Sequence, residues 1–228
     1  SETVDQEFGH RIVARNDGRS VVISAPGKGQ GEIQFLFRAS SATGTLLQTQ
    51  LTGTMTDNDD NTSRLGDSLS MSTDENFVVA GAPFTNTIGL DGSTRQLNSG
   101  LLKIYVWDPA TFKYGLLETV TPPTDGSSAN EGLNFGWAHK ISEPTSSSVR
   151  STAQKYLFVS APGHDSDQGR VYMYTWSIGA DGSTYSTWTQ DYTIEAPDGG
   201  SGQRFGHRIA ANDNGDILAV SSLAPGNA

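Results

Sequence analysis

The sequence predicts an all-β fold, a β-propeller portion made of four-stranded units, and three observations support this. The pentapeptide FGHRI occurs at Phe8–Ile12 and again at Phe205–Ile209, and related Leu-Gly and Phe-Gly pairs begin at Leu65 and Phe135. Each of these pairs is followed by a short apolar run that ends in Ala-Pro. No segment combines a helical apolar period with the residues that begin and end helices.

The first two strands of each unit are expected between the aromatic-Gly or Leu-Gly pair and the Ala-Pro. The apolar runs read SVVISAP, NFVVAGAP, YLFVSAP and ILAVSSLAP. The turns before them contain Asn, Asp and Gly, which tolerate the positive φ of tight hairpins. In the first unit the pattern predicts strands at Arg11–Ala14 and Ser20–Ala25.

The third strand of each complete unit begins at a glycine and alternates with period two. The segments are GEIQFLF from Gly31, GLLKIYVW from Gly100 and GRVYMYTW from Gly169, and the first of them predicts a strand at Glu32–Arg38. Both faces of these strands are apolar or aromatic, so each strand needs cover on both sides. We therefore interpret their Tyr and Trp residues as packing between units, in preference to a sugar-stacking surface.

The fourth strand is predicted at Leu46–Leu51 in the first unit and in GLLETVTPP and WTQDYTIEAP of the next two. A polar linker then leads into the following unit. Within one domain, 1–228, the repeats run over 8–64, 65–134, 135–204 and, incompletely, 205–228.

A four-stranded meander with two apolar faces cannot bury itself, but radial stacking of several copies covers both faces, as in a β-propeller. Propellers have roughly four to eight blades, and about three and a half are expected here. We expect the partners to be further repeats of the same chain or other protein chains that complete the propeller.

The segments FGHRI…VVISAP…GEIQF, LGDSL…VVAGAP…GLLKIYV, FGWAH…LFVSAP…GRVYMY and FGHRI…LAVSSLAP resemble the FG-GAP repeats of integrin α-subunit propellers. AGAP at Ala80–Pro83 is the closest literal match. The resemblance implies a noncatalytic binding or structural module outside the cell or at the surface of a cell or particle. Adhesion or assembly of a surface appendage or fibre would be its role. The alternatives are a carbohydrate-binding lectin-type propeller, with glycans as partners, and the accessory propeller of a secreted hydrolase.

In that family the turn between the first two strands often holds a Ca²⁺ loop, and the corresponding turns here are shorter and poorer in carboxylates. Because Ca²⁺ takes six to eight oxygen ligands, ordinary hairpin turns are the favoured interpretation. Asp213 and Asp216 are the nearest approach to a Ca²⁺ site. The Asp-rich segments Thr56–Ser63 and Gly163–Gly169 are interpreted as solvated connections, and no cofactor is firmly implied.

The histidines do not form a recognisable catalytic motif in the sequence. His10 and His207 occupy one repeat position, where the other units have Asp67 and Trp137, so we interpret that position as structural. His139 and His164 have no local Ser or carboxylate arrangement typical of a triad, and G-x-S-x-G and H-E-x-x-H are absent. The sequence therefore predicts no catalytic residue and no enzyme.

Composition excludes several other classes. The net charge of −10 disfavours binding to nucleic acid and to anionic membranes, and no apolar stretch reaches the roughly 20 residues of a membrane span. The absence of cysteine excludes disulfides, thiolate metal sites and cysteine nucleophiles. Asn61, in Asn61-Thr62-Ser63, is a glycosylation candidate.

Overall fold

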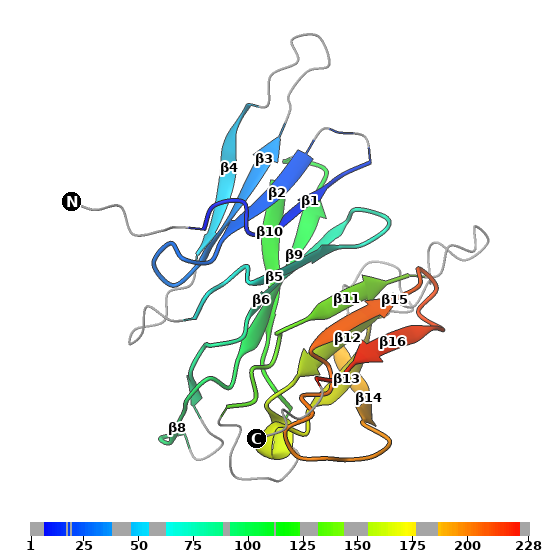
Figure 1. The fold of residues 1–228 in the computed structure, drawn as a ribbon. Helices are drawn as coiled ribbons and strands as arrows, with labels where there is room; N and C mark the ends of the chain where they lie inside the picture. Colours follow the sequence, from blue (N-terminus) through cyan, green and yellow to red (C-terminus); the bar gives the residue numbers. More distant parts are fainter. Residues whose placement is uncertain are drawn as a thin grey trace.

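The computed structural model describes residues 7–16, 18, 20–37, 47–54, 63–88, 92–111, 113–123, 132–143, 155–176 and 187–223. These residues form antiparallel sheets and a single helical turn, α1 (His164–Asp167). The fold is all-β, as the sequence predicts, and the sheets follow one another across the molecule in chain order without closing into a ring (Figure 1).

Three of the sheets contain four strands in meander order. The first sheet confirms the four strands expected in the first unit, although the fourth continues to Thr54. The strands of the first sheet are β1 (Ile12–Ala14), β2 (Ser20–Ala25), β3 (Glu32–Phe37) and β4 (Leu47–Thr54). The second sheet contains β5 (Ser68–Met71), β6 (Phe77–Ala82), β9 (Leu101–Asp108) and β10 (Lys113–Val120). The third contains β11 (His139–Ser142), β12 (Lys155–Ala161), β13 (Arg170–Trp176) and β14 (Thr189–Glu195).

Two smaller sheets complete the described structure. The hairpin of β7 (Thr87–Ile88) and β8 (Arg95–Gln96) lies in the connection between β6 and β9. After the third sheet, β15 (Arg208–Ala211) pairs with β16 (Leu218–Ser221), and the described residues supply no further strand to this pair.

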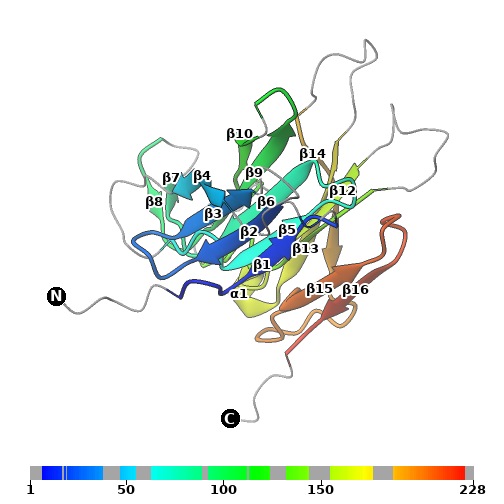
Figure 2. The same cartoon turned by 90° about the horizontal axis from the view of Figure 1, so that it is seen from above.

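The sheets are arranged so that their first strands adjoin. β1 contacts β5, β5 contacts β11, and β11 contacts β15. The view from above shows the sheets side by side in this order (Figure 2). Residues on these four strands, although distant in sequence, therefore line one edge of the arc.

A hydrophobic core fills each space between neighbouring sheets. Between the first and second sheets, Phe35 packs against Tyr105 and Tyr114, with ring centroids 5.4 and 5.1 Å apart. Between the second and third, Phe77 packs against Trp176 at 5.2 Å. The buried aromatic residues of the strands thus pack between sheets, which confirms that interpretation over a sugar-stacking surface.

The junctions between sheets explain why the repeat needs its Leu-Gly or Phe-Gly pair. Leu65 N donates a hydrogen bond to Gln30 O at 3.0 Å, and Phe135 N donates to Ser99 O at 3.0 Å. Gly66 follows at φ +92°, and a Cβ there would lie 2.5 Å from Ser24 Cβ. Only a residue without a side chain fits this position, because the backbone of one sheet passes against the small residue before Ala-Pro in the preceding sheet.

Candidate functional site

A groove of about 400 Å³ runs across the adjoining first strands of the first three sheets. The walls come from β1, β5 and the turn after each, and from β11. The lining residues are Val13, Ala14, Asn16, Leu69, Ser70, Met71, Ser72, Thr73, Glu75 and Lys140.

Ser70 on β5 and His139 on β11 face each other across the junction of the second and third sheets. Ser70 Oγ lies 2.8 Å from His139 Nδ1. Ser68 lies on the same face of β5 as Ser70, because alternate residues of a strand share a face. Its Oγ donates a hydrogen bond to Gly136 O at 2.7 Å. Ser70 is partly exposed and lines the groove, whereas only 8% of His139 is exposed.

His139 is uncharged at neutral pH in this environment. Burial lowers the pKa of His139 to about 4. A hydrogen bond with the Ser68 backbone raises the pKa, but by less than burial lowers it. The roles in this contact depend on the tautomer: with the proton on Nε2, which is buried and has no hydrogen-bond partner among the described residues, Nδ1 accepts a hydrogen bond from the Ser70 hydroxyl. This is the arrangement of a nucleophile and its general base. Among the described residues, no carboxylate is in hydrogen-bond contact with His139.

Among the charged residues around the groove, Lys140 places a cation on its wall. Glu75 is held by Arg15, whose Nε lies 2.8 Å from Glu75 Oε2, and by the backbone N–H of Asn16 at 2.5 Å. Lys140 Nζ approaches Asp213 only to 4.0 Å, and 61% of the Asp213 side chain is exposed. Such an exposed pair is weak, so the Lys140 ammonium can act on negative charge that develops in the groove.

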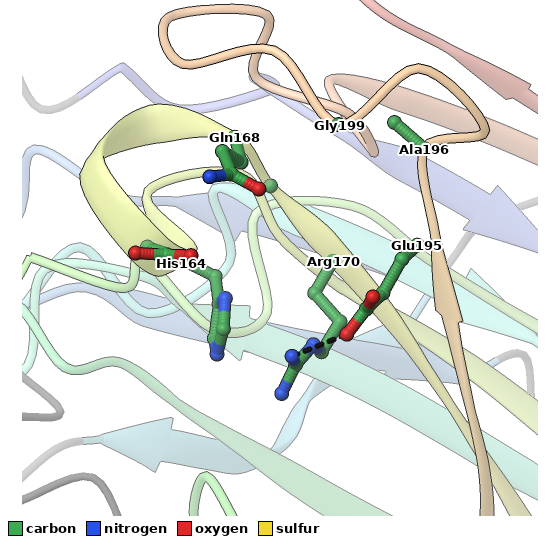
Figure 3. Close-up of a pocket in the computed structure, with 8 residues that line it drawn as sticks. His164, Gln168, Arg170, Glu195, Ala196 and Gly199 are labelled. Atoms are coloured by element: carbon green, nitrogen blue, oxygen red, sulfur yellow. Dashed lines mark hydrogen bonds and ion pairs between the residues drawn. The ribbon is translucent and has the colours of Figure 1, made fainter.

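A second, smaller cavity of about 60 Å³ lies beside α1 (Figure 3). His164, Gln168 and Arg170 reach it from α1 and the start of β13, and Glu195 reaches it from the end of β14. It shares no lining residue with the groove.

The residues considered for calcium lie in the turn between β15 and β16. Gly215 N donates to Asn212 O at 3.1 Å, and Asp216 accepts a hydrogen bond from the Asn212 side chain. In the described part of the chain, no three His, Asp or Glu side chains gather as metal ligands. Asn61 and the Asp-rich segment that precedes it lie outside the described residues.

The histidines differ in their surroundings. His10 lies 3.6 Å from Asp67 of the second sheet, and His207 packs on Trp137 with ring centroids 5.8 Å apart, so both take part in contacts between sheets. The pairing of His139 with Ser70 was missed in the sequence because the two residues are 69 positions apart. The repeat alignment was the one available signal, since it places both residues on the first strands of adjacent units.

Comparison by sequence finds no matching family model and no matching curated protein. By structure, the chain resembles a Bacteroides fragilis protein assigned as a 6-phosphogluconolactonase, with a TM-score of 0.50 and 14% identity over 92% of this chain and 46% of that chain. It also resembles a periplasmic gluconolactonase of Pseudomonas aeruginosa (TM-score 0.43, 12% identity, 94% and 42% covered). A Bacteroides uniformis protein assigned as a 6-phosphogluconolactonase matches with a TM-score of 0.38 and 14% identity (91% and 62% covered).

This chain spans 42% to 62% of the length of these three proteins. At such identities the likeness shows the fold, which is β-propeller-like with several antiparallel sheets.

The structural likeness corrects the prediction of a noncatalytic adhesion or assembly module and the prediction that the chain is no enzyme. Both predictions depended on a fold analogy with integrin-type propellers and on the absence of catalytic sequence motifs. A solved structure with a similar fold is instead assigned as a 6-phosphogluconolactonase. The physical reason for the error is that a fold does not determine chemistry, and a side-chain pair brought together across two sheets, such as Ser70 and His139, leaves no local motif.

Within the described residues, no helix has the length and apolar character needed to cross a membrane.

Proposed function

We propose that the chain is part of a β-propeller hydrolase that opens lactones or related esters, with Ser70 as nucleophile and His139 as base. The observation that carries the proposal is the 2.8 Å contact between Ser70 Oγ and His139 Nδ1 at the wall of a groove of about 400 Å³. The likeness of the fold to a structure assigned as a 6-phosphogluconolactonase supports this class of reaction.

In the proposed reaction, neutral His139 takes the proton of Ser70 as Oγ attacks the carbonyl carbon of the lactone. The tetrahedral intermediate collapses, the ring C–O bond breaks, and His139 returns the proton to the alkoxide that leaves. Water, deprotonated by His139, then hydrolyses the seryl ester and releases the hydroxy acid. The Lys140 ammonium on the same groove stabilises the oxyanion.

We also propose that the sheets are FG-GAP-type blades of a larger propeller at the cell surface or outside the cell. Further repeats or other chains would complete it. The partly exposed apolar residues of β15 and β16 support this, because exposed apolar faces favour association. The blade number and the location follow from the resemblance of the repeats and stay predictions.

The test of the hydrolase is activity against a panel of γ- and δ-lactones and p-nitrophenyl acetate. We expect Ser70→Ala to lower kcat at least about 100-fold, the scale of losing a nucleophile and its proton transfer, while the variant stays folded by circular dichroism. A fluorophosphonate probe should label Ser70. Ser222→Ala, the same substitution at an exposed serine that lines neither cavity, should retain activity. Undiminished hydrolysis by Ser70→Ala, or no hydrolysis by the parent protein, would refute the proposal.

The pKa of His139 predicts a pH dependence of stability. Folding lowers this pKa to about 4 from about 6.5 in the unfolded chain, so the unfolded state binds more protons between these values. The free energy of unfolding should therefore be highest above pH 6.5 and fall by roughly 3 kcal/mol as the pH drops toward 4. Urea unfolding at several pH values would measure this, and His139→Gln should flatten the slope. An equal slope in parent and variant would contradict the assignment.

A further inference from the structure

The cavity beside α1 has the chemistry of a small anion site. Its walls carry three side chains with N–H donors, His164, Gln168 and Arg170. In Figure 3 the His164 ring and the Arg170 guanidinium project toward the same side of the cavity, with Glu195 beyond Arg170. A guanidinium has only donors and matches a carboxylate in a two-bond arrangement. The donors of His164 and Arg170 therefore face one region of the cavity, and Gln168 lies apart from them in Figure 3.

Arg170 interacts with the Tyr172 side chain and with a carboxylate that is held loosely. Arg170 Nη2 is paired with Glu195 Oε1. The Arg170 side chain is only 17% exposed, whereas that of Glu195 is 63% exposed. An ion pair with an exposed carboxylate contributes little, so a ligand carboxylate in the cavity can replace Glu195 without a large loss.

The backbone that positions His164 and Gln168 is strained. Asp165, Ser166 and Asp167 have φ values of 47°, 58° and 63°, a left-handed conformation that is costly for residues with a Cβ. It is maintained by the segment after β14, where Ser201 Oγ donates to Ser166 O at 2.9 Å and Arg204 N donates to Asp167 O at 2.7 Å. Local strain of this kind concentrates at binding sites.

We propose that this cavity binds a small monocarboxylate, with its oxygens between Arg170 and His164. A single negative charge is favoured, because Asp165 and Glu195 also line the cavity and would repel a dianion such as phosphate. The volume of about 60 Å³ limits the enclosed part of the ligand to a few heavy atoms. The site is independent of the Ser70–His139 groove.

Calorimetric titration with glycolate, and separately with inorganic phosphate, tests the proposal. We expect saturable glycolate binding that weakens at least about 10-fold in Arg170→Met and is unchanged in Arg95→Met, which removes an exposed arginine elsewhere. Glu195→Gln should bind glycolate about 5-fold more tightly, because the competing carboxylate is gone, and a purely structural Arg170–Glu195 pair would not give this gain.

Glu195→Gln also keeps the test decisive if Arg170→Met does not fold. The site is refuted if glycolate does not bind or if Glu195→Gln leaves its affinity unchanged. Phosphate binding tighter than glycolate binding would overturn the choice of a monocarboxylate.

Discussion

In the second, third and fourth units, the glycine after the aromatic residue or leucine lies against a small residue of the preceding sheet. Gly66 lies against Ser24 and Gly206 against Ser160, and Gly136 approaches Gly81. The two halves of the repeat, the residue pair ending in glycine and the small residue before Ala-Pro, are thus two sides of one contact. At the scale of the residue, this contact determines how closely two sheets approach.

Gly136→Val tests this contact. Gly136 has φ +85°, and a Cβ would lie 2.8 Å from Leu101 O and 3.0 Å from Leu102 Cδ2. Backbone strain and overpacking together should lower the free energy of unfolding by about 3 kcal/mol or more. Gly115→Val is the matched control, because nothing lies within 4 Å of its Cβ position. Chemical denaturation would compare the free energies of unfolding of the two variants. A Gly136→Val variant as stable as the control would show that the two sheets can move apart to accept the side chain.

At the scale of the element, the second and third sheets are joined by a buried ion cluster as well as by apolar packing. Lys155 at the start of β12 pairs with Asp74, in the turn between β5 and β6, at 2.7 Å, and also with Glu143. Lys155 Nζ lies 5.4 Å from the centre of the Phe77 ring. Burial raises the pKa of Glu143. Burial also acts to raise the pKa of Asp74, but hydrogen bonds from Lys155 and Ser72 outweigh it, so the pKa of Asp74 is lowered. The cluster holds a hairpin turn of one sheet against the first two strands of the next.

Lys155→Met should be strongly destabilising although methionine fills much of the space. It leaves Glu143 buried without its cation, and the loss of one partner of a buried pair costs about 3–5 kcal/mol. Lys140→Met removes the cation of an exposed pair, Lys140–Asp213, in which the Asp213 side chain is 61% exposed, and should cost less than about 1 kcal/mol. Thermal unfolding of both variants gives the comparison. Equal losses would show that the Lys155 cluster contributes no more than a surface pair.

At the scale of the whole molecule, the described sheets form an open arc. The β15–β16 hairpin at one end has partly exposed apolar residues, and Ile217 and Leu223 beside it are 66% and 40% exposed. Unpaired strand edges and exposed apolar faces favour association.

We therefore predict that residues 1–228, expressed alone, associate at micromolar concentration. Sedimentation velocity would show species larger than the 24.3 kDa chain. A monomer that unfolds cooperatively at that concentration would contradict this prediction, because it would show that the exposed faces and strand edges of the arc need no further partner.

The sequence by itself determined the strands, the turns and the order of the sheets. The first-unit strands and the alternation of GRVYMYTW could be predicted because side-chain period and turn residues act over a few positions. The junction glycines could be placed for the same reason, since they recur at one position in every unit.

Only the tertiary structure decided which residues meet at a site. Ser70 contacts His139 across two strands that are far apart along the chain. Arg170 contacts Glu195 because the register of β13 and β14 places them opposite each other. Such pairings depend on how sheets stack, and no local pattern encodes them. For that reason the all-β, propeller-like fold was correctly predicted from the repeat, while the noncatalytic function inferred from the same repeat was wrong.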